Sequence, residues 1–227
     1  MGGAIVEGLL AGSLVKNEDI CISDVSRHAV ERFAKSGANI TTENRVAAIG
    51  GDMVFVVVKP WLTEQVLRDV RKVLDYECQQ LVVVAAGITG DQLRQWMEKD
   101  GRQPQMWLCI PNIAIAQLSS MTFLVPVEAT KPQTEQVKTL LDSMGQTIVT
   151  EERLLGAGTT LASCGIAYAM RYIRAAAEGG VELGFKADLS KQIVMQTLKG
   201  AVALLESSGL HPEAAIDLVT TPGGVTI

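Results

Sequence analysis

The chain has 227 residues, of which 48% are hydrophobic and 20% are charged, and its formal net charge is −5. A chain of this length can bury a sizeable core in one large domain or two small ones. The acidic balance, without a basic run or a lysine and arginine stripe between aromatic residues, argues against nucleic acid as a partner.

Membrane insertion and secretion are not expected either. No stretch reaches about 18 uninterrupted apolar residues, the length that a membrane span needs, and the first residues lack the features of a signal peptide. The four cysteines, Cys21, Cys78, Cys109 and Cys164, form no C-x-x-C pair. This spacing favours reduced thiols, and we therefore expect a cytoplasmic protein without a membrane partner.

The first 150 residues alternate between predicted helices and predicted strands. Amphipathic segments predict helices at 2–12, 26–36, 44–49, 61–74, 89–99 and 132–144. Apolar, β-branched runs predict strands at 20–23, 39–41, 53–59, 81–87, 106–112, 121–126 and 146–150. The alternation predicts a doubly wound α/β domain over residues 1–150.

From residue 151 onward the pattern is helical throughout. Helices are predicted at 159–184, 188–207 and 212–220, followed by a tight turn at 221–224. The longest of them opens with the small residues 162–165, where backbone amides can approach a ligand closely. We therefore predict a second, all-helical domain over residues 151–227.

The chain begins with what looks like the end of a dinucleotide-binding fingerprint. That fingerprint needs a strand, a glycine turn and a helix start, but only Met1-Gly2 and the helix behind them are present. Asp24 follows Gly2 at about the 20-residue spacing of the fingerprint's acidic position. The helix 2–12, which begins on Gly-Gly at the first residue, is expected to have nothing to dock on. From this and the position of Asp24 we expect a Rossmann-like domain whose first strand and two glycines lie upstream of residue 1. The alternative is that Gly2-Gly3 is an ordinary flexible terminus.

The carboxyl ends of the predicted strands form the expected ligand edge. They carry Ser23-Asp24, Lys59-Pro60, Ala85-Ala86-Gly87 and Pro111-Asn112. Asp24 could accept hydrogen bonds from a ribose, which favours NAD, or it could cap the next helix. Alternatively, Ser23, Ser26 and Arg27 could hold a 2′-phosphate, which favours NADP.

The remaining charged residues give weaker signals. His28 and His211 lie apart from other metal-type ligands, so neither a metal site nor a Ser/His triad is expected. Lys59 is interpreted either as a cation beside phosphate or ribose, or as a solvated lysine. We interpret Glu151-Glu152 as a pair that complements a helix dipole, in preference to acid/base catalysis.

Several segments resemble the pyrroline-5-carboxylate reductase family, in the family's order along essentially the whole chain. They are VVVKP (56–60), VVAAGIT (83–89), Pro111-Asn112, Gly165 with Ala167-Tyr168, EGGVELGF (178–185) and HPEAAIDLVTTPGGVTI (211–227). The last contains the family's most specific signature, the Pro-Gly-Gly-x-Thr-Ile turn. The resemblance implies an NADP- or NAD-dependent oxidoreductase that reduces 1-pyrroline-5-carboxylate to L-proline, the last step of proline synthesis.

The resemblance also implies site residues. The implied cofactor contacts are Gly2, Asn44, Val58, Lys59, Pro60, Ala85, Ala86 and Gly87. The strand-end residues Ser23, Asp24, Arg27 and Asn112, considered above, complete the expected cofactor set. The implied substrate contacts are Glu152, a small-residue loop with Ser163, Cys164 and Gly165, and the last turn with Gly223, Gly224 and Thr226. Thr226 is the implied catalytic residue, as a donor to the substrate carboxylate or ring nitrogen. The positive end of a helix starting at residue 166 is expected to assist the loop amides.

The chain departs from the family pattern at several positions. The loop usually reads Ser-Gly-Ser-Gly-Pro-Ala-Tyr, whereas residues 162–168 read Ala-Ser-Cys-Gly-Ile-Ala-Tyr. Ile113 stands where a threonine is usual beside the nicotinamide, and Ile216 stands where a lysine is usual. The family also continues beyond the final turn, so we expect a chain truncated at both ends.

The resemblance and the composition of the helical part both predict a homodimer or higher homo-oligomer. One layer of helices cannot cover the apolar surface of this part by itself, and the family dimerises through these helices. Two other interpretations stay open: a non-catalytic dimeric relative with impaired cofactor binding, and a related imine reductase.

Overall fold

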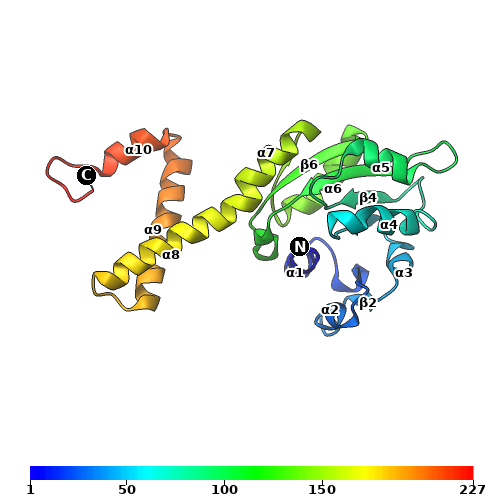
Figure 1. Ribbon diagram of the computed structural model, residues 1–227, viewed down its shortest axis with the longest axis horizontal. Coiled ribbons are helices and arrows are strands. Elements are labelled where there is room, and N and C mark those ends of the chain that lie inside the picture. The colour runs from blue at the N-terminus through cyan, green and yellow to red at the C-terminus, as the bar shows by residue number, and fades with distance from the viewer. Residues whose placement is uncertain (227) are drawn as a thin grey trace. The chain divides into compact units, whose positions relative to one another are not determined.

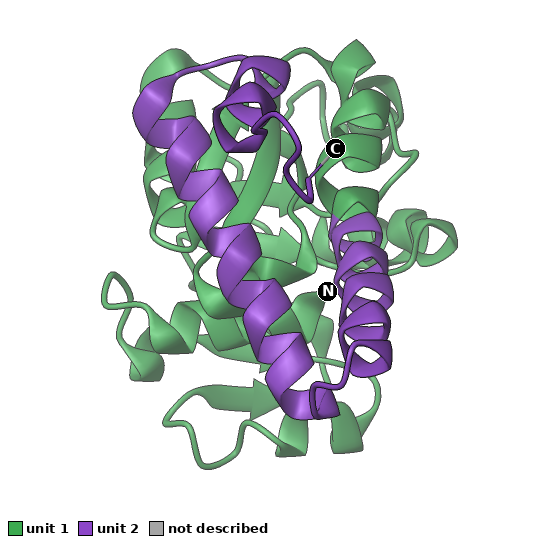
Figure 2. Cartoon of the chain, turned by 90° about the vertical axis from the view of Figure 1, so that its left-hand side faces the viewer, with its two compact units in different colours: residues 1–165 green, residues 166–227 purple. Residues whose placement is uncertain are grey.

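The structure is a computed structural model that describes residues 1–226, and the chain divides into two compact units (Figures 1 and 2). The first unit is Met1–Gly165 and the second is Ile166–Ile227. The domain boundary that the sequence suggested, after residue 150, falls inside the first unit.

The first unit contains two separate sheets. The small sheet pairs β1 (Cys21–Ser23) with β2 (Asn39–Thr41) in parallel. The large sheet has the order β3-β4-β5-β6-β7. Its strands are β3 (Met53–Val56), β4 (Gln80–Val83), β5 (Gln105–Ile110), β6 (Ser120–Glu128) and β7 (Gly145–Val149).

The large sheet is mixed rather than wholly parallel. β3, β4 and β5 are parallel, but β6 runs antiparallel to β5, with Cys109 opposite Leu124. Residues 111–119, which include the 3₁₀ helix η2 (Ile113–Gln117), are too few for the crossover that a parallel pair requires. β7 is again parallel to β6, since the longer connection through α6 (Lys131–Asp142) makes a crossover possible.

Local sequence explains where the other helices of this unit begin. Pro60 occupies the first turn of α4, where its missing N–H costs nothing. Thr89 and Gln92 form a reciprocal capping box at the start of α5. The helices are α1 (Gly2–Ala11), α2 (Arg27–Glu31), α3 (Asn44–Ala48), α4 (Pro60–Val70) and α5 (Gly90–Met97), with the 3₁₀ helices η1 (Asn17–Asp19) and η3 (Glu152–Leu154). The helix predicted at 26–36 is therefore shorter than expected.

Alternate residues of the central strands fill two apolar layers, one on each face of the large sheet. Leu81 and Val83 join the layer that includes side chains of α3, α4 and α5. Val82 and Val84 join the layer that includes side chains of α1, η2 and α6. The two-residue period of a strand produces this division, and each fully buried Leu or Val contributes about 1.5–3 kcal/mol.

Helix α1 is well docked, so the expectation that it has nothing to dock on is wrong. Ala4 and Ile5 are buried in the second layer. Gly8 packs directly on η2, where an added Cβ would lie 2.5 Å from the Ile115 carbonyl oxygen. The 3₁₀ helix between β5 and β6, which sequence periodicity did not reveal, provides this surface.

The second unit consists of helices only, as predicted. These are α8, which runs Gly165–Glu182 from the end of the first unit, α9 (Ala187–Ser208) and α10 (Pro212–Val219). Ser190 and Ala215 are the only buried residues among the described positions 166–226. Within the described part of the chain, no helix combines the length and apolar character needed to cross a membrane.

Candidate active site

The cofactor residues suggested by the sequence lie at one edge of the large sheet or beside it. Val58-Lys59-Pro60 follows β3, Ala85-Ala86-Gly87 follows β4, and Asn112 follows β5. Because these three strands are parallel, their carboxyl ends share one edge of the sheet. The order of strands therefore brings together three segments that are far apart in the sequence.

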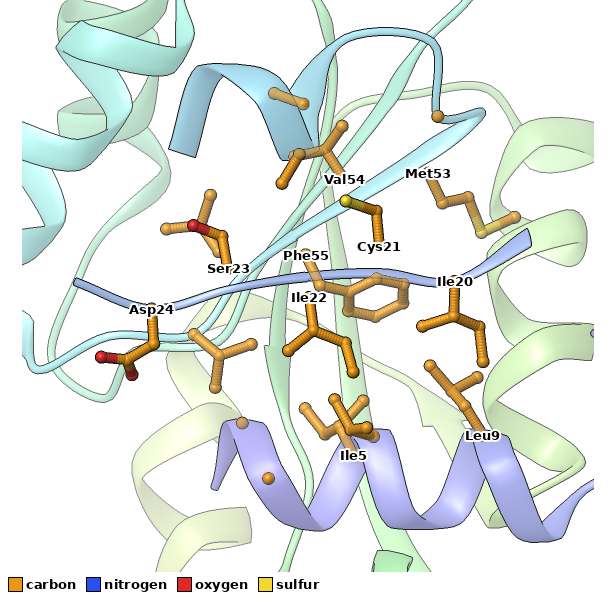
Figure 3. A pocket seen from close by; sticks show the side chains of 18 of the residues that line it. Ile5, Leu9, Ile20, Cys21, Ile22, Ser23, Asp24, Met53, Val54 and Phe55 are labelled. Carbon is orange, nitrogen blue, oxygen red and sulfur yellow. The ribbon is translucent and has the colours of Figure 1, made fainter. Parts of the chain in front are cut away.

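A large cavity of about 1720 Å³ lies between α1, β1 and β3 (Figure 3). Six of the expected cofactor residues line it: Gly2, Ser23, Asp24, Asn44, Val58 and Lys59. The other six lie outside its lining: Arg27, Pro60, Ala85, Ala86, Gly87 and Asn112. The sequence thus predicted the part of the lining that comes from the start of α1, the residues after β1 and β3, and the start of α3.

Hydrogen bonds order the polar side chains after β1. The Ser23 hydroxyl donates to Asn44 Oδ1 at 2.9 Å, and Asp24 Oδ1 accepts from the Ser26 amide at 2.8 Å. Asp24 therefore closes a turn before α2 rather than capping α2 itself. Arg27 donates to Glu31 at 2.9 Å in an exposed pair. Such a pair is worth about 0–1 kcal/mol, so a bound phosphate can compete for Arg27.

Two basic side chains of the cavity were missed by sequence reasoning. His28 and Arg32 both line it and lie four residues apart, a spacing that places them on one helical face. The Arg32 guanidinium lies against Gly3, where an added Cβ would be 1.7 Å from Nη2. Arg32 also pairs with Glu7 at 3.4 Å. The start of α1 has no side-chain cap, so its first amides and Arg32 together suit an anion.

Cys21, on β1, lines the cavity and is partly exposed. Burial raises the pKa of the Cys21 thiol above its ordinary value. The thiol is therefore neutral near pH 7, which argues against a role as a nucleophile.

Asn112 is buried and its side chain is used within the chain. Its Oδ1 accepts from the Ala114 amide at 3.0 Å, and its Nδ2 donates to the Ala162 carbonyl at 3.4 Å. The Ser163 hydroxyl donates to the Pro111 carbonyl at 3.4 Å. Pro111 and Asn112 thus hold the end of β5 against residues 162–163, which is a positioning role.

The loop expected at residues 162–165 is a helix in the structure. α7 (Leu155–Gly158), the π-helical segment η4 (Thr159–Cys164) and α8 follow one another without a break. Ile166 retains the N–H that a proline would lack, so the helix can continue through this point. Because no helix begins at residue 166, the expected helix N-terminus for a carboxylate is wrong. π-helical segments are nevertheless frequent at functional sites.

Glu152 has a structural partner. Its Oε2 accepts a hydrogen bond at 3.1 Å from the amide of Gly90, the first residue of α5. The Glu152 carboxylate therefore complements the N-terminal end of α5, which is remote in the sequence. The sequence instead suggested that Glu151 and Glu152 together complement the dipole of the helix that follows them. Glu151 instead pairs with Arg153.

The last turn lies in the second unit. The Gly224 amide donates to the Thr221 carbonyl at 2.8 Å, which closes the predicted turn. The Thr226 hydroxyl donates to the Val219 carbonyl at 3.4 Å, at the end of α10. Thr226 is exposed, so this long hydrogen bond leaves its hydroxyl accessible to a ligand.

Comparison with family models matches both parts of the chain. Residues 1–87 match the model described as NADP oxidoreductase, coenzyme F420-dependent. Residues 152–227 match the model described as pyrroline-5-carboxylate reductase dimerisation. An α/β nucleotide-type domain followed by such a helical domain defines a class of two-domain oxidoreductases.

Individual relatives narrow this class. Pyrroline-5-carboxylate reductase 1 of Dictyostelium discoideum is 34% identical and is matched by 100% of this chain, which spans 43% of that protein. Pyrroline-5-carboxylate reductase 3 of Danio rerio is 30% identical, again over 100% of this chain and over 78% of the relative. The chain belongs to the pyrroline-5-carboxylate reductase family.

Solved structures agree with this assignment. The pyrroline-5-carboxylate reductase of Streptococcus pyogenes has a TM-score of 0.84 and 27% identity, over 99% of this chain and 83% of that one. The NADP-bound pyrroline carboxylate reductase of Plasmodium falciparum has a TM-score of 0.87 at 21% identity, over 99% and 82%. The second likeness establishes the fold alone.

Proposed function

We propose that this protein reduces 1-pyrroline-5-carboxylate to L-proline with NADPH or NADH. The observation that carries the proposal is that six expected cofactor residues, from separate segments of the chain, line one cavity. Family membership supplies the reaction class, since the relatives named above are reductases of this imine.

The part of the cavity lined by the start of α1 and by the residues after β1 fits a dinucleotide. The first turn of α1 has no side-chain cap, and the guanidinium of Arg32 lies over Gly3, so the helix start and this cation could together bind a pyrophosphate. Ser23 and Asp24 would bind the adenosine ribose. Because Asp24 favours a free 2′-hydroxyl and Arg27 a 2′-phosphate, both cofactors remain part of the proposal.

The bound cofactor supplies a hydride to the imine carbon, while the ring nitrogen keeps the proton that it carried into the site. The product is the secondary amine of proline, so charge and atoms balance without a further acid. The residues of the chain bind the cofactor and the imine and orient them towards each other. Holding two flat reactants in register can lower a barrier by about 7–11 kcal/mol.

Substrate recognition is assigned by family resemblance to residues in both units. In the first unit these are Glu152, Ser163, Cys164 and Gly165, and in the second Gly223, Gly224 and Thr226. The accessible hydroxyl of Thr226 is the group that we expect to donate to the substrate. Residues 163–165 belong to a helix, so their backbone amides are engaged within it. We expect these residues to contribute instead through the side chains of Ser163 and Cys164 and through the small size of all three.

The functional form that we propose is a cytoplasmic homodimer. The second unit exposes large apolar side chains, including Leu183 at 83%, Met170 at 60% and Tyr172 at 57% exposure. Covering them needs another apolar surface, and the matching family model is a dimerisation domain. Free thiols at all four cysteines favour a reducing compartment.

Steady-state kinetics of Thr226→Ala test the substrate assignment. Loss of one hydrogen bond to a charged ligand should raise KM for the imine about tenfold, while KM for NADPH changes little. Thr226→Ser keeps the hydroxyl and serves as the matched control. Equal losses for both substrates would contradict the role of Thr226, and absence of turnover in the wild-type protein would contradict the proposed reaction.

A further inference from the structure

Ser120 begins β6 at the edge of the large sheet where β5 ends. β6 runs antiparallel to β5, so its first residue lies beside the segment that follows the carboxyl end of β5. Ser120 is buried, at 3% exposure, and its Oγ accepts a hydrogen bond at 3.2 Å from the amide of Asn112. Because Pro111 has no N–H, the side chain of Ser120 satisfies the first backbone donor after β5.

A second buried hydroxyl holds the side chain of Ser120 in place. Thr122 lies two residues further along β6, a spacing that puts both side chains on one face of the sheet. Thr122 is fully buried, and its Oγ1 is hydrogen-bonded to Ser120 Oγ at 3.0 Å. Since a hydroxyl can take part in more than one hydrogen bond, Ser120 binds Asn112 and Thr122 at the same time.

The backbone of Ser120 is fixed independently of its hydroxyl. Its amide donates to the Met144 carbonyl at 3.1 Å, and it lies opposite Gly145 in the register of β6 and β7. An added Cβ at Gly145 would lie 2.2 Å from the Ser120 carbonyl oxygen, so the two strands are in direct contact at this point. Loss of the hydroxyl alone is therefore expected to disturb Asn112 and to leave the strand in place.

Asn112 connects this pair of hydroxyls to the π-helical segment η4. Its side-chain Nδ2 donates to the Ala162 carbonyl at 3.4 Å, and the Ser163 hydroxyl donates to the Pro111 carbonyl at 3.4 Å. Both hydrogen bonds are long, so they depend closely on where residues 111–112 lie. π-helical geometry is itself rare, and we infer that these contacts help to hold it.

Thr147, on the neighbouring strand β7, is a buried hydroxyl that takes no part in these contacts. It lies opposite Thr122 in the register of the two strands and is 7% exposed. Among the described residues, its Oγ1 has no hydrogen-bond partner. Removing the Thr147 hydroxyl therefore breaks no hydrogen bond, which makes this residue a matched control for Ser120.

We propose that Ser120 is a positioning residue for substrate binding. Its hydroxyl fixes the amide of Asn112, and Asn112 in turn fixes the carbonyl of Ala162. The expected substrate residues 163–165 follow directly in the same helix. This inference rests on the proposed function, because family resemblance assigns those residues to the imine.

Steady-state kinetics of Ser120→Ala test the inference. Loss of one buried hydrogen bond should raise KM for the imine about fivefold at saturating NADPH, while KM for NADPH and kcat change less than about twofold. Thr147→Val, which removes a hydroxyl at nearly constant shape, should change none of the three constants. Thr122→Val should raise KM for the imine in the same direction, and it provides the test if Ser120→Ala does not fold.

Hydrogen–deuterium exchange of the free protein gives a readout that does not depend on activity. Ser120→Ala should speed amide exchange in residues 159–165 at least about fivefold, since local opening there becomes easier, and should leave exchange in β4 unchanged. Thr147→Val should alter neither region.

Several outcomes would overturn the positioning role. They are an unchanged KM for the imine in both Ser120→Ala and Thr122→Val, an equal rise in both KM values, and a raised KM for the imine without faster exchange in residues 159–165. Failure of the proposed function is a different result. Faster exchange in this segment, combined with a wild-type protein that does not reduce the imine, would support the link from Ser120 to Ala162 and contradict the proposed reaction.

Discussion

At the scale of the residue, Glu152 has two candidate roles, one in binding substrate and one in stabilising the start of a helix. Family resemblance places it beside the substrate, whereas the structure places its carboxylate on the amide of Gly90 at the start of α5. An acidic side chain at a helix start is stabilising on its own account. The structural role needs no ligand, so it can be tested separately.

Glu152→Ala should lower the free energy of unfolding by about 0.5–2 kcal/mol, the usual effect of losing a helix cap. Glu152→Gln keeps an oxygen acceptor and should lose less. Chemical denaturation measures both, and Glu151→Ala, which removes only an exposed pair with Arg153, is the matched control. If Glu152→Gln instead raises KM for the imine with unchanged stability, the carboxylate binds substrate directly.

At the scale of the element, the packing of α9 on α8 gives a physical reason for one of the two adjacent glycines in EGGVELGF (178–185). Ser190 of α9 is buried, and its hydroxyl donates to the Ala177 carbonyl of α8 at 2.7 Å. An added Cβ at Gly180 would lie 2.0 Å from Ser190 Oγ, while one at Gly179 would meet nothing within 4 Å. Only one of the two glycines is therefore required by this contact.

Gly180→Ala should destabilise the protein by about 1–3 kcal/mol, since overpacking outweighs the gain of about 1 kcal/mol in helix propensity. Gly179→Ala, its neighbour in the same helix, should be neutral or stabilising by up to about 1 kcal/mol. Urea denaturation at one fixed protein concentration compares them. Ser190→Ala should relieve part of the Gly180→Ala loss, and equal effects of the two alanines would refute this account of the crossing.

The segment from α7 to α8 is a continuous helix, although part of it was expected to be a loop. Small residues at 162–165 suggested a loop, but strong helix formers on both sides and the N–H of Ile166 allow a continuous helix. The extra residue of the π-helical segment is accommodated beside Asn112, whose amide donates to the Ala162 carbonyl.

At the scale of the whole molecule, the second unit has too little interior to be stable by itself. Two buried residues among positions 166–226 cannot offset the entropy of ordering the rest. Leu189 and Ile193, one turn apart on α9, are 46% and 41% exposed. We expect them to be covered by a second copy.

Ile193→Glu should weaken self-association about 30-fold or more, the effect of losing a contact worth about 2 kcal/mol. Lys191→Glu, on the same helix at an already polar position, should leave self-association nearly unchanged. Sedimentation velocity over a range of concentrations measures both. A wild-type protein that sediments as a monomer at all concentrations would contradict the proposed dimer.

Local pattern was enough to predict most of the elements. Residues 53–59 and 81–87 predict strands by their β-branched runs, and helices α8, α9 and α10 follow from helical periodicity within a few residues. The residues after β3, β4 and β5, from Val58 to Asn112, follow from the same reading because these parallel strands share one edge of the large sheet.

Contacts between distant segments lay beyond such reasoning. The sequence by itself determined the helical and strand segments, the family resemblance and the residues at the strand ends, since these depend on neighbours a few positions apart. Only the tertiary structure decided that α1 packs on η2 and that β6 runs antiparallel to β5. It also decided that Glu152 accepts a hydrogen bond from the Gly90 amide, and that β1 and β3 line the same cavity. Each of these depends on which segments, remote in the chain, come to share a surface, and burial in three dimensions fixes that choice.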